Sequence, residues 1–106
     1  MIEIGDVNDY PSPSMKRVDI DGLRLCVMNV ENDFYVIDDR CSHADFSLSE
    51  GDLDTSAKEV ECPKHGAIFD ITSGEPRSLP ATQNVKTYRV LVNDGKVFIE
   101  TEDENA

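Results

Sequence analysis

The pattern of apolar and polar residues predicts a series of short β-strands in the first part of the chain. Residues Met15–Ile20 alternate, and the Asp-Gly pair that follows predicts a hairpin turn. The next run, Leu23–Val30, is mostly apolar at successive positions, which is typical of a strand with little exposure. Turn residues separate it from a third run, Phe34–Asp38. These runs predict an antiparallel meander of three strands.

The alternation stops between Arg40 and Leu53, where the chain is rich in Ser, Asp and Glu. This stretch predicts a long loop, and long loops inside compact domains usually have a function. Short strands are predicted at Lys58–Glu61 and Ala67–Ile71, on either side of a second loop. A final hairpin is predicted to join Val85–Val92 to Lys96–Glu100 around an Asn-Asp-Gly turn.

Helical periodicity is absent from the whole chain. A single turn near Asp6–Tyr10, ending before Pro11, is the only helix that we expect. The pattern therefore predicts an all-β fold without internal repeats. With 106 residues the chain is long enough for one domain and too short for two. Residues 101–106, three of which are acidic, are expected to form a frayed tail.

The charge balance excludes several classes of partner. Ten basic residues against twenty-two acidic ones give a formal charge of −12, which argues against binding to nucleic acid or to an anionic membrane. The acidic residues favour solubility, and some of them can steer a basic protein partner. No apolar run is long enough to cross a membrane, and the N-terminus lacks the features of a signal peptide, so we expect a cytoplasmic protein.

Two short motifs carry the candidate chemistry. Cys41 and His43 form a Cys-x-His pair, and Cys62 and His65 form a Cys-x-x-His pair. Both histidines of the chain and two of its three cysteines lie in these motifs. Soft sulfur with borderline nitrogen suits Zn²⁺ or an iron–sulfur centre and suits Mg²⁺ or Ca²⁺ badly. The third cysteine, Cys26, lies on a predicted strand without a companion ligand, and we expect it to be a core residue.

The order of the ligands distinguishes between the two metal centres. Common zinc modules pair Cys with Cys and His with His, whereas here each loop offers one of each. A binuclear cluster accounts for this order, because a Rieske [2Fe–2S] centre has two cysteines on one iron and two histidines on the other. A zinc-stabilised binding module stays open as an alternative, since two Cys and two His also suit zinc.

The motifs Cys-x-His, Cys-Pro-x-His-Gly-Ala-x-Phe-Asp, Thr-Ser-Gly-Glu and Leu-Pro-Ala resemble those of Rieske-type ferredoxins. These proteins are the small electron-transfer components of bacterial aromatic-ring dioxygenases and related non-haem iron oxygenase systems. The resemblance implies three stacked antiparallel sheets, with the cluster at the tip of a subdomain spanning about residues 40–80. It also implies that Cys41 and Cys62 hold the buried iron, that His43 and His65 hold the outer iron, and that Pro80 lies in a third loop over the cluster.

Four positions indicate which kind of Rieske centre this is. High-potential relatives have a disulfide between the cluster loops, at positions that are Phe46 and Lys64 here. They also carry a Ser and a Tyr that donate hydrogen bonds to cluster sulfurs, where this chain has Ala67 and Phe69. Such donors stabilise the reduced cluster, so their absence predicts a potential near the low end of the Rieske range, about −150 mV.

A count of ligands argues against catalysis by the chain itself. A mononuclear non-haem iron site needs two histidines and a carboxylate, and the proposed cluster already uses both histidines. We therefore expect no catalytic residues. The predicted function is that of a monomeric one-electron carrier, which docks transiently with an NAD(P)H-dependent reductase and a terminal oxygenase. The small subunit of an assimilatory nitrite reductase is an alternative, because its fold is similar.

Overall fold

The computed structural model describes residues 1–41, 46–63, 66–78 and 83–100, and in this part of the chain nearly all regular structure is β. Two single-turn 3₁₀ helices, η1 (Val7–Asp9) and η2 (Leu48–Glu50), are the only helices there. None of the helices in the described residues is long and apolar enough to span a membrane. The strands are β1 (Ile2–Asp6), β2 (Ser14–Ile20), β3 (Leu23–Val30), β4 (Asp33–Asp38), β5 (Asp52–Asp54), β6 (Glu59–Glu61), β7 (Ile68–Asp70), β8 (Thr87–Tyr88), β9 (Val90–Asn93) and β10 (Lys96–Ile99).

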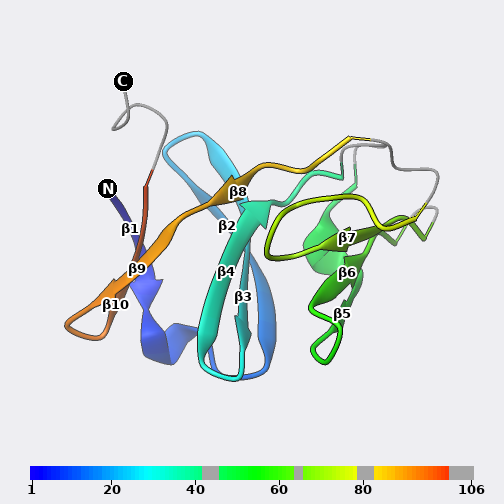
Figure 1. Ribbon diagram of the computed structural model, residues 1–106. Helices are drawn as coiled ribbons and strands as arrows, with labels where there is room; N and C mark the ends of the chain where they lie inside the picture. The colour runs from blue at the N-terminus through cyan, green and yellow to red at the C-terminus, as the bar shows by residue number, and fades with distance from the viewer. Residues whose placement is uncertain (42–45, 64–65, 79–82, 101–106) are drawn as a thin grey trace.

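The strands form three antiparallel sheets, which confirms the prediction of an all-β fold with three antiparallel sheets. The central sheet has the order β2-β3-β4-β8, the second has β1-β10-β9, and the third has β5-β6-β7. In Figure 1 the second and third sheets lie on opposite sides of the central one. The predicted meander is the β2-β3-β4 part of the central sheet. Its first turn places Asp21 and Gly22 at positive φ (51° and 77°), as the Asp-Gly pair predicts.

The expected single strand at Val85–Val92 is wrong. It is two strands that belong to different sheets: β8 pairs with β4, and β9 pairs with β10. The chain changes sheets at Arg89, as Figure 1 shows where β8 passes into β9. The side chain of Tyr88 helps to hold β8 in the central sheet, because its hydroxyl donates a hydrogen bond of 2.7 Å to Asp38 Oδ1. These contacts are distant in sequence, so the local pattern contained no signal for the break.

Two further expectations need correction. The predicted loop from Arg40 to Leu53 contains η2 and the start of β5, so the expectation of a single helical turn is also wrong. The turn expected near Asp6–Tyr10 is present as η1, but the strand β1 before it was missed. Both β1 and β5 are defined by pairing with distant partners, β10 and β6 respectively. Short strands of this kind take their stability from the partner rather than from their own pattern.

Two hydrophobic cores lie on the two faces of the central sheet. Strand β3 serves both, with Leu25 and Val27 on one face and Cys26 and Met28 on the other. The cysteine core is Cys26, Met28, Val30, Ile37, Cys41, Leu48, Val60, Cys62, Ala67, Phe69, Ile71 and Val85. The tyrosine core is Ile4, Tyr10, Leu25, Val27, Val36, Tyr88, Val97 and Ile99. The continuous apolar run predicted as a strand with little exposure is therefore the shared wall of both cores.

Candidate metal centre

The first loop leaves the central sheet just after β4 and places Cys41 in the cysteine core. The residue is 2% exposed. Its backbone N–H donates to the carbonyl of Phe46 at 3.0 Å, and Arg40 and Ser47 form an isolated antiparallel bridge. The two stems of the loop are thus paired on either side of the residues that carry the first motif.

The second loop begins directly after β6 and places Cys62 in the same core. Cys62 is 1% exposed. Its N–H donates to the carbonyl of Ala67 at 2.7 Å, and its own carbonyl accepts from the N–H of Gly66 at 3.2 Å. Gly66 has φ of +73°, a conformation that residues with a side chain rarely adopt. A glycine at this position is therefore required by the tight return of the chain after the second motif.

Strand pairing holds the stems of the two loops together. Asp52, which follows the first loop, pairs with Glu61, which precedes Cys62. The approach is close, because a Cβ at Gly51 would overlap the carbonyl oxygen of Glu61. Only glycine fits there, and the contact fixes the end of the first loop against the start of the second.

All three cysteines are buried in the cysteine core and none forms a disulfide. The expectation that Cys26 is a core residue is confirmed, since it is fully buried on β3. Burial raises the pKa of the Cys26 thiol far above its ordinary value, and the negative charge of Asp39 raises that pKa further. Cys26 is therefore a neutral thiol at physiological pH.

The chain that leads to the third loop runs beside β7. The N–H of Arg77 donates to the carbonyl of Ile68 at 2.6 Å, and the N–H of Ile68 donates to Ser78 Oγ at 3.0 Å. Arg77 also forms an ion pair with the buried carboxylate of Asp70. Residues 79–82, with Pro80, lie outside the described residues.

Asp70 is a buried carboxylate between the cysteine-core residues Phe69 and Ile71, and the sequence did not single it out. Burial raises the pKa of its carboxyl, but hydrogen bonds from Thr72 and Arg77 outweigh that effect and lower the pKa to about 2. The Thr72 N–H and hydroxyl both donate to Asp70 Oδ1, at 2.7 and 2.6 Å. An Asp followed two residues later by Thr-Ser-Gly is a turn pattern, and this was the available signal.

The structure brings together two of the four predicted ligands. Cys41 and Cys62 lie in one core, whereas His43, His65 and the neighbouring Lys64 lie outside the described residues. Within the described residues, no group of three or more His, Cys, Asp or Glu side chains converges on a common point. Identification of the centre therefore depends on the comparison with known proteins.

The model of the Rieske [2Fe–2S] domain matches residues 1–89 of the chain. The chain belongs to the Rieske [2Fe–2S] family. It is 43% identical over 94 residues to a 3-phenylpropionate/cinnamic acid dioxygenase ferredoxin subunit from Shigella flexneri, covering 89% of this chain and 87% of that protein. Among solved structures it is similar to the ferredoxin of carbazole 1,9a-dioxygenase from Nocardioides aromaticivorans, with a TM-score of 0.88, 28% identity, and coverage of 92% and 94%.

A second solved structure is a complex of reduced oxygenase and oxidised ferredoxin in carbazole 1,9a-dioxygenase. This chain matches it with a TM-score of 0.85 and 33% identity, covering 93% of this chain and 100% of the matched one. The Rieske family and these relatives establish the cofactor and the class of protein. The protein carries a Rieske-type [2Fe–2S] cluster, transfers electrons, and is not itself the catalytic subunit.

The described residues fit such a cluster. A Rieske centre takes two cysteine thiolates on one iron, and the structure offers two disulfide-free cysteines buried in a single apolar core. A buried thiolate needs a positive charge beside it, which iron supplies. When bound, the cluster supplies one-electron chemistry. The protein supplies the apolar walls around the cysteines and the paired loop stems that hold them in place.

Proposed function

We propose that this Rieske ferredoxin accepts single electrons from an NAD(P)H-dependent reductase and delivers them to a terminal non-haem iron oxygenase. The similarity to a ferredoxin found in complex with its oxygenase carries the proposal. The relative from Shigella flexneri, of which this chain covers 87%, is a ferredoxin subunit of 3-phenylpropionate/cinnamic acid dioxygenase. We further propose that the protein acts as a monomer in the cytoplasm and docks transiently with each partner.

We propose that Cys41 and Cys62 bind the inner iron and that His43 and His65 bind the outer iron. The burial of both cysteines supports the first part, since a ligand of an inner iron must be shielded from solvent. The position of each cysteine at the start of its loop supports the second part. Each histidine follows its cysteine by two or three residues, farther along the same loop.

We propose a low reduction potential, about −150 mV, for this cluster. Ala67 and Phe69 are both fully buried in the core that contains Cys41 and Cys62. Neither side chain has a hydrogen-bond donor for a cluster sulfur. A low potential suits a carrier that is reduced by an NAD(P)H-dependent reductase.

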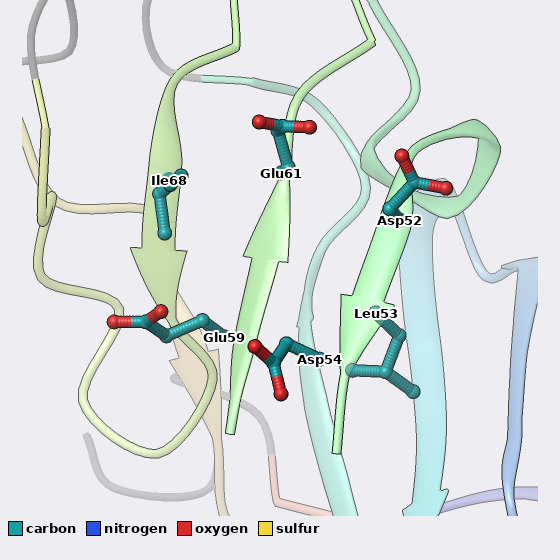
Figure 2. Close-up of a pocket in the computed structure, with 6 residues that line it drawn as sticks. All are labelled: Asp52, Leu53, Asp54, Glu59, Glu61 and Ile68. Carbon is teal, nitrogen blue, oxygen red and sulfur yellow. The ribbon is translucent and has the colours of Figure 1, made fainter. Parts of the chain in front are cut away.

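An acidic groove on the third sheet supports docking to a basic partner. It is lined by four acidic residues and two apolar ones: Asp52, Asp54, Glu59, Glu61, Leu53 and Ile68. Figure 2 shows the four carboxylates projecting from β5 and β6. The acids face one another across the strands, as Asp52 opposite Glu61 and Asp54 opposite Glu59. Glu59 has a positive neighbour in Arg77, whose Nε lies 4.0 Å from its Oε2. Like charges opposite each other destabilise a sheet, so a positive partner surface would relieve the repulsion between Asp52 and Glu61. Strand β6 leads directly to Cys62.

The cluster proposal is tested by purifying the protein anaerobically and measuring iron, zinc, visible absorption and the electron-spin signal after reduction. We expect a red-brown protein with two irons per chain and an average g value below that of all-cysteine [2Fe–2S] ferredoxins. Replacing either cysteine, Cys41→Ser or Cys62→Ser, should abolish the native spectrum, whereas Cys26→Ser should preserve it. A colourless protein with stoichiometric zinc would contradict the proposal.

The carrier role is tested by stopped-flow mixing of the reduced protein with an oxidised dioxygenase. We expect its visible spectrum to return to the oxidised form while the oxygenase is reduced. A midpoint potential above about +100 mV would contradict the low-potential assignment. Failure to exchange electrons with any aromatic-ring oxygenase, at normal cluster content, would contradict the proposed partner class while leaving the cluster assignment intact.

A further inference from the structure

Asp39 is a fully buried carboxylate two residues before Cys41. Carboxylates are rarely buried unless they are paired, and Asp39 has partners on two sides. Its Oδ2 lies 3.5 Å from Nε of Arg24 and 3.9 Å from Nε of Arg17, both on the central sheet. Its Oδ1 accepts a hydrogen bond of 2.7 Å from the backbone N–H of Ser49, beyond the first motif.

The backbone of Asp39 makes the same connection. Its N–H donates to the carbonyl of Arg24 at 3.0 Å, which ties the entry of the loop to β3. Its carbonyl accepts from the N–H of Leu48 at 2.7 Å, which ties the entry of the loop to its exit. Side chain and backbone together join three segments at one residue: strand β3, the stem before Cys41, and the first turn of η2.

Ser47 completes the link to the two arginines. Its hydroxyl accepts from Arg24 Nη2 at 2.6 Å and from Arg17 Nη1 at 3.4 Å. Arg24 therefore contacts the entry stem through Asp39 and the exit stem through Ser47. The two stems cannot slide relative to each other, or lift from the central sheet, without breaking these charge-assisted contacts.

Stability alone is a weak reason for such an arrangement, because desolvation offsets much of the attraction in a buried ion pair. Fixing the geometry of the two loop stems has a clear use beside Cys41. The stems carry Cys41, and a metal ligand must be held in position by residues around it if the centre is to keep one geometry.

We propose that Asp39 is the positioning residue of the first cluster loop, and that through Arg24 and Ser49 it holds Cys41 in the orientation that the cluster requires. The proposal rests on the ligand role proposed above for Cys41. Asp39 is proposed neither as a cluster ligand nor as a docking residue. Its effect reaches the cluster through the backbone on both sides of Cys41.

The test compares Asp39→Asn and Asp39→Ala with the wild-type holoprotein. Three quantities are measured: the rate of bleaching of the visible absorption in the presence of an iron chelator, the g values of the reduced cluster, and the melting temperature. The Asn variant retains an oxygen that can accept from Ser49 but loses the charge that attracts the arginines. The Ala variant loses both. We expect bleaching to become at least ~10-fold faster in Asp39→Ala, which corresponds to about 1.4 kcal/mol, with a smaller increase in Asp39→Asn.

Two matched controls separate positioning from loss of stability. Asp19→Asn removes the exposed carboxylate that pairs with Arg17 Nε at 2.9 Å, and it should leave bleaching and g values unchanged. Ile99→Val trims the tyrosine core on the far face of the central sheet, and it should lower the melting temperature without altering the g values. A third variant, Ser47→Ala, removes the hydroxyl that Arg24 and Arg17 both contact, and it should accelerate bleaching less than Asp39→Ala does.

If Asp39→Ala does not fold, the Asn and Ser47→Ala variants decide the question. Unaltered g values and bleaching in both would overturn the proposal, as would changes that merely follow the melting temperature as they do in Ile99→Val. The ligand assignment has its own test, because a native spectrum in Cys41→Ser would refute it whatever the Asp39 variants do.

Discussion

The two cores of this protein share the central sheet but differ in what they contain. The cysteine core holds all three cysteines and packs the sheet that follows the first cluster loop, whereas the tyrosine core holds none and packs the sheet formed by the two ends of the described chain. Both are made of buried aliphatic and aromatic residues on β-strands. With the ligands proposed above, one face of the central sheet carries the cofactor and the other face stabilises the fold. A mutation on each face should therefore affect different properties.

The largest expected effect comes from removing one large side chain from each core. We expect Phe69→Ala in the cysteine core to lower the free energy of unfolding by about 3–5 kcal/mol, and Ile99→Ala in the tyrosine core by about 2–5 kcal/mol. Only Phe69→Ala should reduce the iron content per folded chain, because Phe69 packs in the core that contains Cys41 and Cys62. Denaturant unfolding and iron analysis measure the two quantities. Equal iron loss in both variants would show that the cores do not differ in this way.

The next effect concerns the buried carboxylate of Asp70, which pairs with Arg77 on the chain that leads to the third loop. The pKa of Asp70 is lowered from 3.8 to about 2, so its ionised form contributes stability above pH 4 that is lost as the pH falls toward 2. We expect Asp70→Asn to be less stable than the wild type by about 2 kcal/mol at pH 7. The difference should narrow between pH 4 and pH 2. Urea unfolding at a series of pH values, followed by circular dichroism, measures it. A difference that stays constant over this range would exclude the carboxylate as its cause.

Substitution of Cys26 shows whether every cysteine of the cysteine core takes part in the metal centre. Because its thiol is buried and its pKa is raised, we expect it not to react with a thiol reagent at pH 8 in the folded protein. The variant Cys26→Ser should keep the native spectrum. Its unfolding free energy should fall by about 1–3 kcal/mol, since it buries a hydroxyl in an apolar site. Cys26→Ala, which buries no polar group, serves as the matched control. Loss of the spectrum in both variants would make Cys26 part of the centre.

The smallest expected effect is electrostatic. Asp52→Asn, which removes one of two opposed charges in the acidic groove, should raise stability by about 0.2–1 kcal/mol. It should also slow electron transfer to a basic partner at low salt, and the difference from wild type should disappear at high salt. Asp94→Asn removes a charge of the same kind from the turn between β9 and β10. It should change neither the stability nor the rate of electron transfer. If the electron-transfer rates of the wild type and both variants depend on salt in the same way, the acidic groove is not part of the docking surface.

The amino-acid sequence by itself determined the local structure and the chemistry of this protein. The pattern of apolar and polar residues predicted β2, β3 and β4 because their neighbours in the sheet are also neighbours in the chain, joined by turns whose residues adopt positive φ. The Cys-His pairs indicated a Rieske cluster because ligand type and order reflect the needs of the metal. The boundary of the cluster-binding subdomain, at about residues 40–80, stays a prediction.

Only the tertiary structure decided which strands meet across the chain and which charges are buried. The division of β8 from β9, and the strands β1 and β5, depend on partners far away in sequence. Asp39 and Asp70 looked like ordinary members of an acidic chain, and only the packed structure distinguishes them from the exposed acids. The physical reason is that burial and ion pairing arise from the approach of distant segments, whereas turns and ligand motifs are formed by residues that are already adjacent.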